Sequence, residues 1–348
     1  MKTIVFTGGG TAGHIMPNIA LIEKLRDYKI YYLGSDGMEK RILKAYPKVS
    51  FITIPVVKFV RSLTPKNLLI PFKLTNSIHT CKRILQEIKP DVIFSKGGYV
   101  SIPVCIAGNK LNIPVITHES DLSVGLANKI IGRKAKHVCC SFEDTAVKFG
   151  KNAIFTGTPI RNSILHGDKK IVYKRHRIIA NKPVILIVGG SLGALSVNKC
   201  IWENIDKLTS KYIVLHIVGK NNLNKELSTI KDYFQIEFAD DIQNYFDASN
   251  VVISRAGSNT IFELLELNKP MILIPLSKSA SRGDQILNAQ KFENLKYAEV
   301  ILQEDLNGDV LLDKINSTLK NSNIFVNNMR KSKYINGTEK IIDIIKKF

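Results

Sequence analysis

Two segments of the sequence share one design, in which a short run of Val and Ile residues leads into a glycine-rich turn and then a helical pattern. The first is Thr3–Thr7 followed by Gly8–Gly13, and the second is Val184–Val188 followed by Gly189–Gly193. Strands that are apolar throughout are typical of parallel sheets covered by helices on both faces. Two such units predict two Rossmann-like, doubly wound α/β domains that face a central cleft.

The same alternation of apolar runs and helical patterns continues along both halves. A chain of 348 residues also exceeds the size at which one hydrophobic core stops growing. The turn at Gly157-Thr158-Pro159 divides the chain into domains 1–160 and 161–334, and helix 335–348 is expected to complete the first. The Asn-rich sequence at Asn321–Asn328 suggests that the chain crosses back toward the first domain there. We expect strands at Thr3–Thr7, Ile30–Leu33, Phe51–Ile54, Val92–Ser95, Val115–Thr117, His137–Ser141, Val184–Val188, Ile213–Val218, Ile236–Ala239, Val251–Ser254 and Met271–Pro275.

The chain carries a net charge of +20, which favours a polyanionic partner, although a compositional bias toward Lys is an equal alternative. Its only dense basic cluster is Lys174–Arg177, so a nucleic-acid-binding arm is not expected. The five cysteines form neither a C-x-x-C pair nor a metal-ligand spacing. We therefore interpret them as small apolar residues of a protein in a reducing cytosol. The N-terminus has no charged-then-apolar leader and no apolar run is long enough to span a bilayer, so any membrane contact should be peripheral.

The turn Gly8–Gly13 matches G-x-G-x-x-G, in which glycines let the backbone approach a bound group closely. The motif alone fits dinucleotide enzymes equally well, with Asp36 as the ribose acid, and it also fits a tight turn without a ligand. His14 follows the last glycine and can act as a general base toward an attacking hydroxyl. Alternatively, its ring only caps the turn or contacts a phosphate.

A second polar turn follows the predicted strand at Val92–Ser95. Gly97 and Gly98 can bind a diphosphate, which we expect to be that of the acceptor. Tyr99 either contacts a sugar or a lipid or is a packed aromatic side chain. Glu119 ends the next strand and can orient a sugar hydroxyl or assist His14. In the structural alternative, Ser120 or Asp121 caps a helix there.

Polar turns of the second half suit a nucleotide diphosphate donor. Ser191 and the backbone N–H groups of Gly189–Gly193 can bind the diphosphate, with Arg161 as a charge partner. Glu263 lies one helical turn beyond the turn at Arg255–Thr260 and can accept both ribose hydroxyls, although Thr260 and Glu263 also match a capping box.

Asp284 and Gln285 open a further helix and suit hydrogen bonding to pyranose hydroxyls, or they only cap it. No Asp-x-Asp stands at a strand end, so no metal is expected on the diphosphate. Between Ile54 and Lys73 the chain is apolar and basic, which suits the surface of an anionic membrane or, equally, a segment that covers the sheet.

Together these motifs resemble a family, the UDP-N-acetylglucosamine transferases of peptidoglycan synthesis, which add N-acetylglucosamine to undecaprenyl-pyrophosphoryl-N-acetylmuramoyl-pentapeptide. The resemblance covers nearly the whole chain, in eight segments whose order is far more specific than one glycine turn. They are Gly8–Pro17, Lys96–Ser101, His118–Asn128, Gly157–Arg161, Gly189–Gly193, Phe238–Ile242, Arg255–Glu263 and Gly283–Ala289.

The resemblance implies an inverting glycosyltransferase of the GT-B type at the cytoplasmic face of the membrane, without a cofactor, since UDP-N-acetylglucosamine is a co-substrate. The base is His14, and backbone around Ala239 and Ile242 reads uracil. The donor residues that the likeness implies are Thr11, Ala12, Gly13, Asp121, Arg161, Ser191, Ala239, Ile242, Ser258, Asn259, Thr260, Glu263, Asp284 and Gln285.

Two residues depart from the family pattern, since Ala12 stands where members often have glycine and Asp121 where many have asparagine. An ionised carboxylate accepts but does not donate, so the departure at Asp121 affects the expected hydrogen bond to the acetylated sugar. The rival enzymes are a glycolipid transferase with another acceptor, such as diacylglycerol, and a sugar-nucleotide epimerase. The rivals from other classes are an NAD-type dehydrogenase and a nucleic-acid-binding module.

Overall fold

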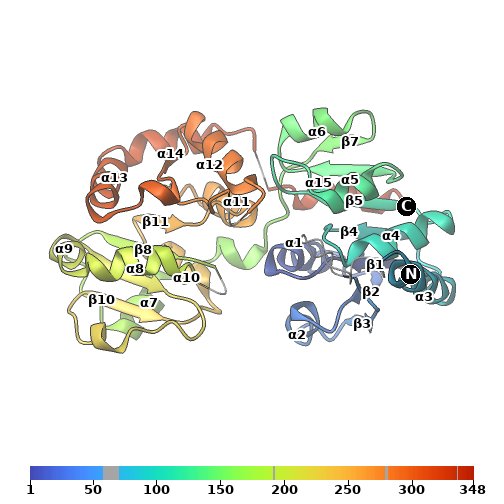
Figure 1. Cartoon of the computed structure of the whole chain (residues 1–348), viewed down its shortest axis with the longest axis horizontal. Helices are drawn as coiled ribbons and strands as arrows, with labels where there is room; N and C mark the ends of the chain where they lie inside the picture. The colour runs from blue at the N-terminus through green and yellow to red at the C-terminus, as the bar shows by residue number, and fades with distance from the viewer. Residues whose placement is uncertain (58–69, 191–192, 279–280, 335) are drawn as a thin grey trace. The chain divides into compact units, whose positions relative to one another are not determined.

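The computed structural model describes the chain except for residues 58–69, 191–192, 279–280 and 335, and this part forms two compact units (Figure 1). Unit 1 comprises Met1–Arg161 and Tyr334–Phe348, and unit 2 comprises Asn162–Lys333. Each unit consists of a parallel sheet between layers of helices. The chain therefore has two doubly wound α/β units.

Among the described residues, unit 1 has a seven-stranded sheet in the order β3-β2-β1-β4-β5-β6-β7, with all strands parallel. Its strands are β1 (Lys2–Thr7), β2 (Tyr28–Gly34), β3 (Val49–Thr53), β4 (Val92–Ser95), β5 (Val115–Glu119), β6 (His137–Cys140) and β7 (Ala153–Phe155). Its helices are α1 (Ala12–Ile22), α2 (Met38–Leu43), α3 (Ile70–Ile88), α4 (Ser101–Lys110), α5 (Leu126–Gly132), α6 (Glu143–Phe149) and α15 (Thr338–Lys346).

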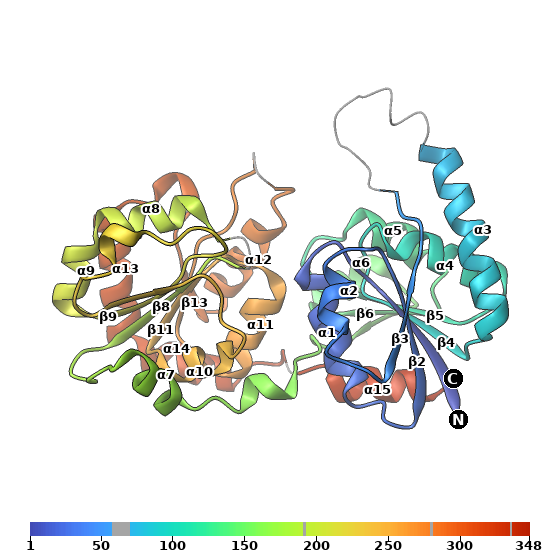
Figure 2. The same ribbon diagram turned by 90° about the horizontal axis from the view of Figure 1, so that it is seen from below.

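Two hydrophobic cores hold unit 1 together, one on each face of its sheet. Helices α1 and α15 cover one face, and α3 and α4 cover the other (Figure 2). Ile341, Ile342 and Ile345 of α15 are buried against the sheet, and Lys24 forms an ion pair of 2.9 Å with Glu339. The last residues of the chain thus contribute to the core that the first residues begin.

Unit 2 repeats the arrangement, with a six-stranded parallel sheet in the order β10-β9-β8-β11-β12-β13 among its described residues. Its strands are β8 (Val184–Val188), β9 (Ile213–Ile217), β10 (Tyr233–Ile236), β11 (Val251–Ser254), β12 (Met271–Leu273) and β13 (Ala298–Val300). Its helices are η2 (Asn162–Leu165), α7 (Lys169–His176), α8 (Leu195–Glu203), α9 (Ile205–Lys211), η3 (Lys225–Leu227), α10 (Ile242–Ala248), α11 (Ser258–Glu266), α12 (Asp284–Asn294), η4 (Gln303–Asp305), α13 (Gly308–Lys320) and α14 (Ser322–Arg330).

The structure corrects the sequence-based expectations at the edges of the sheets. Strand β10 precedes the expected position at Ile236–Ala239, since it ends where Ile236 pairs with Ile217 and Phe238 beyond it is exposed. The three-residue edge strands β7 and β13 were not expected, because runs so short carry little pattern. The predicted crossing at Asn321–Asn328 is wrong, because Asn321 is the N-cap of α14 and the other residues lie in that helix, which belongs to unit 2.

No helix of the described residues is sufficiently long and apolar to cross a membrane. Of the apolar and basic segment Ile54–Lys73, residues 58–69 lie outside the described part of the chain. Phe72 is on the first turn of α3 and is 77% exposed.

Candidate active site

The polar turns of each unit gather where its strand order reverses. In unit 1 this point lies between β1 and β4, where Thr7 pairs with Ser95. In unit 2 it lies between β8 and β11, where Val188 pairs with Ser254. Ligands of open α/β sheets bind outside the carboxyl ends of the strands at such switch points. The fold therefore brings Gly8–Gly13 together with the turn after β4, and the turn after β8 together with the turn after β11.

His14 joins the two turns of unit 1. Its Nδ1 lies 3.2 Å from the carbonyl oxygen of Lys96, which directly precedes Gly97. A carbonyl oxygen only accepts, so Nδ1 must carry a hydrogen, and in the neutral ring Nε2 then carries the lone pair. A Cβ atom added at Gly98 would stand 3.3 Å from Nε2 of His14. The imidazole therefore lies against the second turn in the tautomer that a general base requires.

The turn after β4 needs glycine at both of its first positions after Lys96. Gly97 and Gly98 have φ angles of +81° and +78°, a region that favours glycine. The Ser95 hydroxyl accepts from the Gly97 N–H at 3.0 Å, and the Ser101 hydroxyl donates to the Gly97 carbonyl at 2.7 Å. Tyr99 is half-buried, with its ring against Gly10 of the other turn. The acceptor residues predicted from sequence thus lie beside His14.

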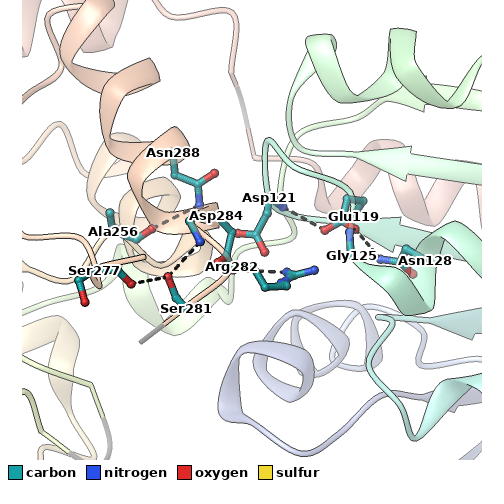
Figure 3. A network of polar contacts seen from close by, with 11 residues as sticks. Glu119, Asp121, Gly125, Asn128, Ala256, Ser277, Ser281, Arg282, Asp284 and Asn288 are labelled. Atoms are coloured by element: carbon teal, nitrogen blue, oxygen red, sulfur yellow. Dashed lines mark hydrogen bonds and ion pairs between the residues drawn. The ribbon is translucent and has the colours of Figure 1, made fainter. Parts of the chain in front are cut away.

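Glu119 organises the connection between β5 and α5 (Figure 3). Its buried carboxylate accepts hydrogen bonds from the N–H groups of Gly125 at 2.8 Å and Asp121 at 3.2 Å, and from the Asn128 amide at 3.1 Å. Burial and the neighbouring Asp121 charge raise the pKa of Glu119, whereas these three donors oppose the shift. The expected cap by Ser120 or Asp121 is wrong, because α5 begins at Leu126 with Gly125 as its N-cap.

Behind these turns lies a buried cation that sequence reasoning missed. Lys96 is 2% exposed, and its ammonium donates to the Ser120 hydroxyl. Burial lowers the pKa of Lys96 to about 8, against the opposing charges of Glu119 and Asp121. Burial also lowers the pKa of His118 well below its ordinary value, so this histidine is neutral and donates from Nε2 to the Gly157 carbonyl at 3.0 Å. Only the glycines marked this segment in the sequence, because a lysine before a turn usually faces solvent.

In unit 2, the helix that follows β11 begins earlier than the capping-box alternative requires. Helix α11 starts at Ser258 with Gly257 as its N-cap, so Thr260 lies inside the helix and does not cap it. The first-turn N–H groups, from Ser258 to Thr260, have no intrahelical acceptor and point toward the carboxyl edge of the sheet. Glu263 lies half-buried in the second turn. This part of unit 2 has the geometry of an anion site with a carboxylate behind it.

Arg255 connects the elements around the switch point of unit 2. Its guanidinium donates to the carbonyl of Ile274 at 3.1 Å and to that of Pro275 at 3.3 Å, and to the Ser196 hydroxyl at 3.0 Å. These bonds join the ends of β11 and β12 to helix α8. Sequence reasoning assigned Arg255 only to the turn, because its partners come from three separate segments. Ser191, predicted to bind the donor, lies outside the described residues.

The predicted sugar contacts stand at the start of α12, whose N-cap is Gly283. Gln285 accepts from the Leu276 N–H at 3.1 Å through its side-chain oxygen, so its amide nitrogen is the group oriented for a further acceptor. Asp284 pairs with Arg282 at 3.4 Å, and nearby the Ser281 hydroxyl donates to Ser277 (Figure 3). The expectation that Asp284 or Gln285 caps the helix is therefore wrong.

The segment predicted to read the base leads into α10. Ala239 is half-buried and Ile242 is the first residue of the helix. Arg175 holds both oxygens of Asp241, the N-cap residue, at 3.1 and 2.7 Å. One member of the dense basic cluster is thus engaged in unit 2. Arg161, predicted to be a charge partner of the donor, is the last residue of unit 1 before the chain passes into unit 2.

A carboxylate at the turn Gly8–Gly13 disfavours the diphosphate of a dinucleotide there. Asp36, the candidate ribose acid, forms an ion pair with Lys40 at 2.7 Å and its side chain is 72% exposed. The buried acid after β2 is instead Glu39, which accepts from the Ser35 N–H at 2.8 Å and the Gly10 N–H at 3.4 Å. No group of three or more His, Cys, Asp or Glu side chains among the described residues is placed to hold a metal ion.

Two doubly wound units in one chain, each with polar turns at its switch point, define a protein of the GT-B class. Residues 4–140 match the N-terminal domain of glycosyltransferase family 28, and residues 184–347 match its C-terminal domain. The chain therefore belongs to glycosyltransferase family 28.

Sequence relatives agree over the full length of the chain. The UDP-N-acetylglucosamine--N-acetylmuramyl-(pentapeptide) pyrophosphoryl-undecaprenol N-acetylglucosamine transferase of Clostridium botulinum is 44% identical over 353 aligned positions, which cover 100% of this chain and 99% of the relative. The protein of the same name from Clostridium tetani is 43% identical, over 100% of this chain and 98% of the relative.

Solved structures agree on the fold. MurG of Acinetobacter baumannii has a TM-score of 0.80 at 23% identity, and both chains are covered completely. The UDP-GlcNAc 2-epimerase of Neisseria meningitidis, bound to UDP-GlcNAc, reaches 0.68 at 16% identity with both chains again covered completely. The fold is therefore common to transferases and epimerases, and the family assignment comes from the sequence matches.

Proposed function

We propose that this chain transfers N-acetylglucosamine from UDP-N-acetylglucosamine to the 4-hydroxyl of an N-acetylmuramoyl-pentapeptide on an undecaprenyl pyrophosphate carrier, with inversion. The observation that carries the proposal is 44% identity over the whole chain to relatives named for this transfer. The polar turns of unit 2 bind the donor in this proposal, and those of unit 1 bind the acceptor.

His14 removes the proton of the acceptor hydroxyl as its oxygen attacks the anomeric carbon, and the bond from that carbon to UDP breaks in the same displacement. The hydrogen bond from Nδ1 to the Lys96 carbonyl supports this role, because it leaves the basic lone pair on Nε2. The helix start at Ser258 and the turn at Gly189–Gly193 stabilise the negative charge that develops on UDP. Glu119 supports the acceptor side through its three hydrogen bonds.

Replacing His14 tests the base directly. His14→Asn retains a donor for the Lys96 carbonyl but has no basic nitrogen, whereas His14→Ala removes both. Each variant should lower the rate of transfer by about 10²- to 10⁴-fold, the usual worth of a general base. Labelled transfer from UDP to a short-chain lipid acceptor measures it. A rate within a few-fold of wild type in His14→Asn would rule His14 out as the base.

Transfer should proceed without a divalent metal. The donor side offers backbone dipoles and a helix start for the diphosphate, and the assay repeated with a chelator should retain its rate.

Transfer should also take place at an anionic membrane surface. The net charge of +20 and the exposed Phe72 beside Lys73 support the membrane contact. Co-sedimentation should be stronger with vesicles that contain anionic lipid than with zwitterionic vesicles.

A further inference from the structure

A fully buried carboxylate lies beneath the first glycine turn of unit 1. Glu39 is the second residue of α2 and is 0% exposed. One of its oxygens accepts from both the N–H and the hydroxyl of Ser35, and the other accepts from the N–H of Gly10 at 3.4 Å. A buried carboxylate is stable only when hydrogen bonds replace its lost water. Its donors here are the β2–α2 connection and the glycine turn itself.

The backbone around Glu39 leaves room for this one side chain. A Cβ atom at Gly9 would stand 2.4 Å from its Oε1, and one at Gly34 would stand 2.9 Å from its Cγ. At Gly37 the corresponding distance to Oε2 is 3.3 Å. Three glycines from two separate connections thus border the same carboxylate. Glycine at these positions, including Gly9 of the first turn, is therefore required by an acid that lies outside the glycine motif.

Glu39 is also linked to the second glycine turn. Burial and the nearby Glu39 carboxylate raise the pKa of the Tyr99 hydroxyl. The Tyr99 ring packs against the first turn, since a Cβ atom at Gly10 would stand 2.8 Å from its Cε1. The carboxylate therefore holds the turn after β1 directly, and it is linked to the turn after β4 through Gly10, against which the Tyr99 ring packs.

The same contact restricts what the first turn can bind. Gly10 has a single N–H, and it points to Glu39. An anionic ligand at this turn would lack that donor and would also face a negative charge in a region shielded from water. The turn at Gly97–Gly98 has instead the Lys96 ammonium in the buried cluster behind it. Charge therefore favours a phosphate at the second turn and an uncharged sugar at the first.

We propose that Glu39 is a positioning residue for the transfer reaction. Its carboxylate holds the two glycine turns of unit 1 in register, and its charge directs the acceptor's diphosphate to Gly97–Gly98 and away from Gly8–Gly10. The inference rests on the proposed function in that unit 1 binds the acceptor.

Three variants separate the two roles of Glu39. Glu39→Gln removes the charge at nearly constant shape, Glu39→Asp keeps the charge but shortens the reach, and Asp36→Asn is the matched control on the same connection. Both Glu39 variants should lower kcat at least tenfold while the KM for UDP-N-acetylglucosamine stays within twofold. Asp36→Asn should match wild type, because Asp36 is exposed and its ion pair with Lys40 lies at the surface.

Binding of inorganic pyrophosphate, measured by calorimetry without any transfer, supplies the second readout. Glu39→Gln should bind pyrophosphate at least threefold more tightly than wild type, and Glu39→Asp should not, since only the former removes the repulsion. Replacing a residue with a purely structural role would not increase the affinity for an anion. Unchanged kcat and unchanged pyrophosphate affinity in Glu39→Gln would overturn the proposal, as would a loss of kcat that merely follows a lower melting temperature. If wild type itself lacked transferase activity, the proposed function would fail while the pyrophosphate comparison still tested Glu39.

Discussion

Gly98→Ala should lower kcat by more than its loss of stability accounts for. The φ angle of +78° costs a residue with a Cβ atom about 1–2 kcal/mol, which for a unit of this size lowers Tm by about 2–8 °C. The new methyl group would also stand 3.2 Å from Cδ2 and 3.3 Å from Nε2 of His14, and 3.1 Å from the Gly9 carbonyl oxygen. The imidazole must shift to relieve these contacts. Misplacing a reacting group by about 1 Å costs about 10²-fold in rate, equivalent to about 2.7 kcal/mol of the barrier.

Gly150→Ala is the matched control for backbone strain. Gly150 has a φ angle of +89° in the same unit, and no atom lies within 4 Å of an added Cβ. Its replacement should cost about 1–3 kcal/mol of stability and leave kcat unchanged. Thermal unfolding and labelled transfer, both well below the melting temperature, compare the two variants. Should Gly98→Ala lose stability yet keep kcat within twofold of Gly150→Ala, the inferred contact between this turn and the His14 ring would be wrong.

Two further predictions concern pH. Burial lowers the pKa of Lys96 from 10.5 to about 8. Between these two pH values the unfolded chain therefore binds a proton at Lys96 that the folded chain has lost. The unfolding free energy of wild type relative to Lys96→Met should therefore rise with pH across this window, and urea unfolding that shows no rise would contradict the burial of the ammonium. The hydrogen bonds from Arg175 lower the pKa of Asp241 below its ordinary 3.8, so their stabilisation exists above that pH and is lost as pH falls through the lowered pKa. Because the two side chains are 44% and 26% exposed, Arg175→Gln should cost at most about 1 kcal/mol near pH 7, and a cost that grew toward acid pH would refute the assignment.

The alternation of apolar runs and helical patterns was sufficient to predict two doubly wound units. It succeeded because strands buried on both faces of a parallel sheet are almost continuously apolar, as β8 is throughout and β4 is up to Ser95. The glycine turns were equally visible, since positive φ angles at Gly97 and Gly98 leave few other residues possible. Family resemblance then connected eight such segments to an activity, which periodicity alone does not specify.

Only the tertiary structure decided which polar side chains support these turns. Glu39 and Lys96 are separated by 57 positions in the sequence, and no pattern marks either as buried, yet both border the glycine turns of one sheet edge. The start of α11 at Ser258, not at Thr260, was likewise decided by the end of β11 and the turn that follows it. Local patterns report which backbone conformations and faces a segment prefers. The partner of a buried charge depends on strand order, because parallel strands bring segments distant in the sequence to a common edge.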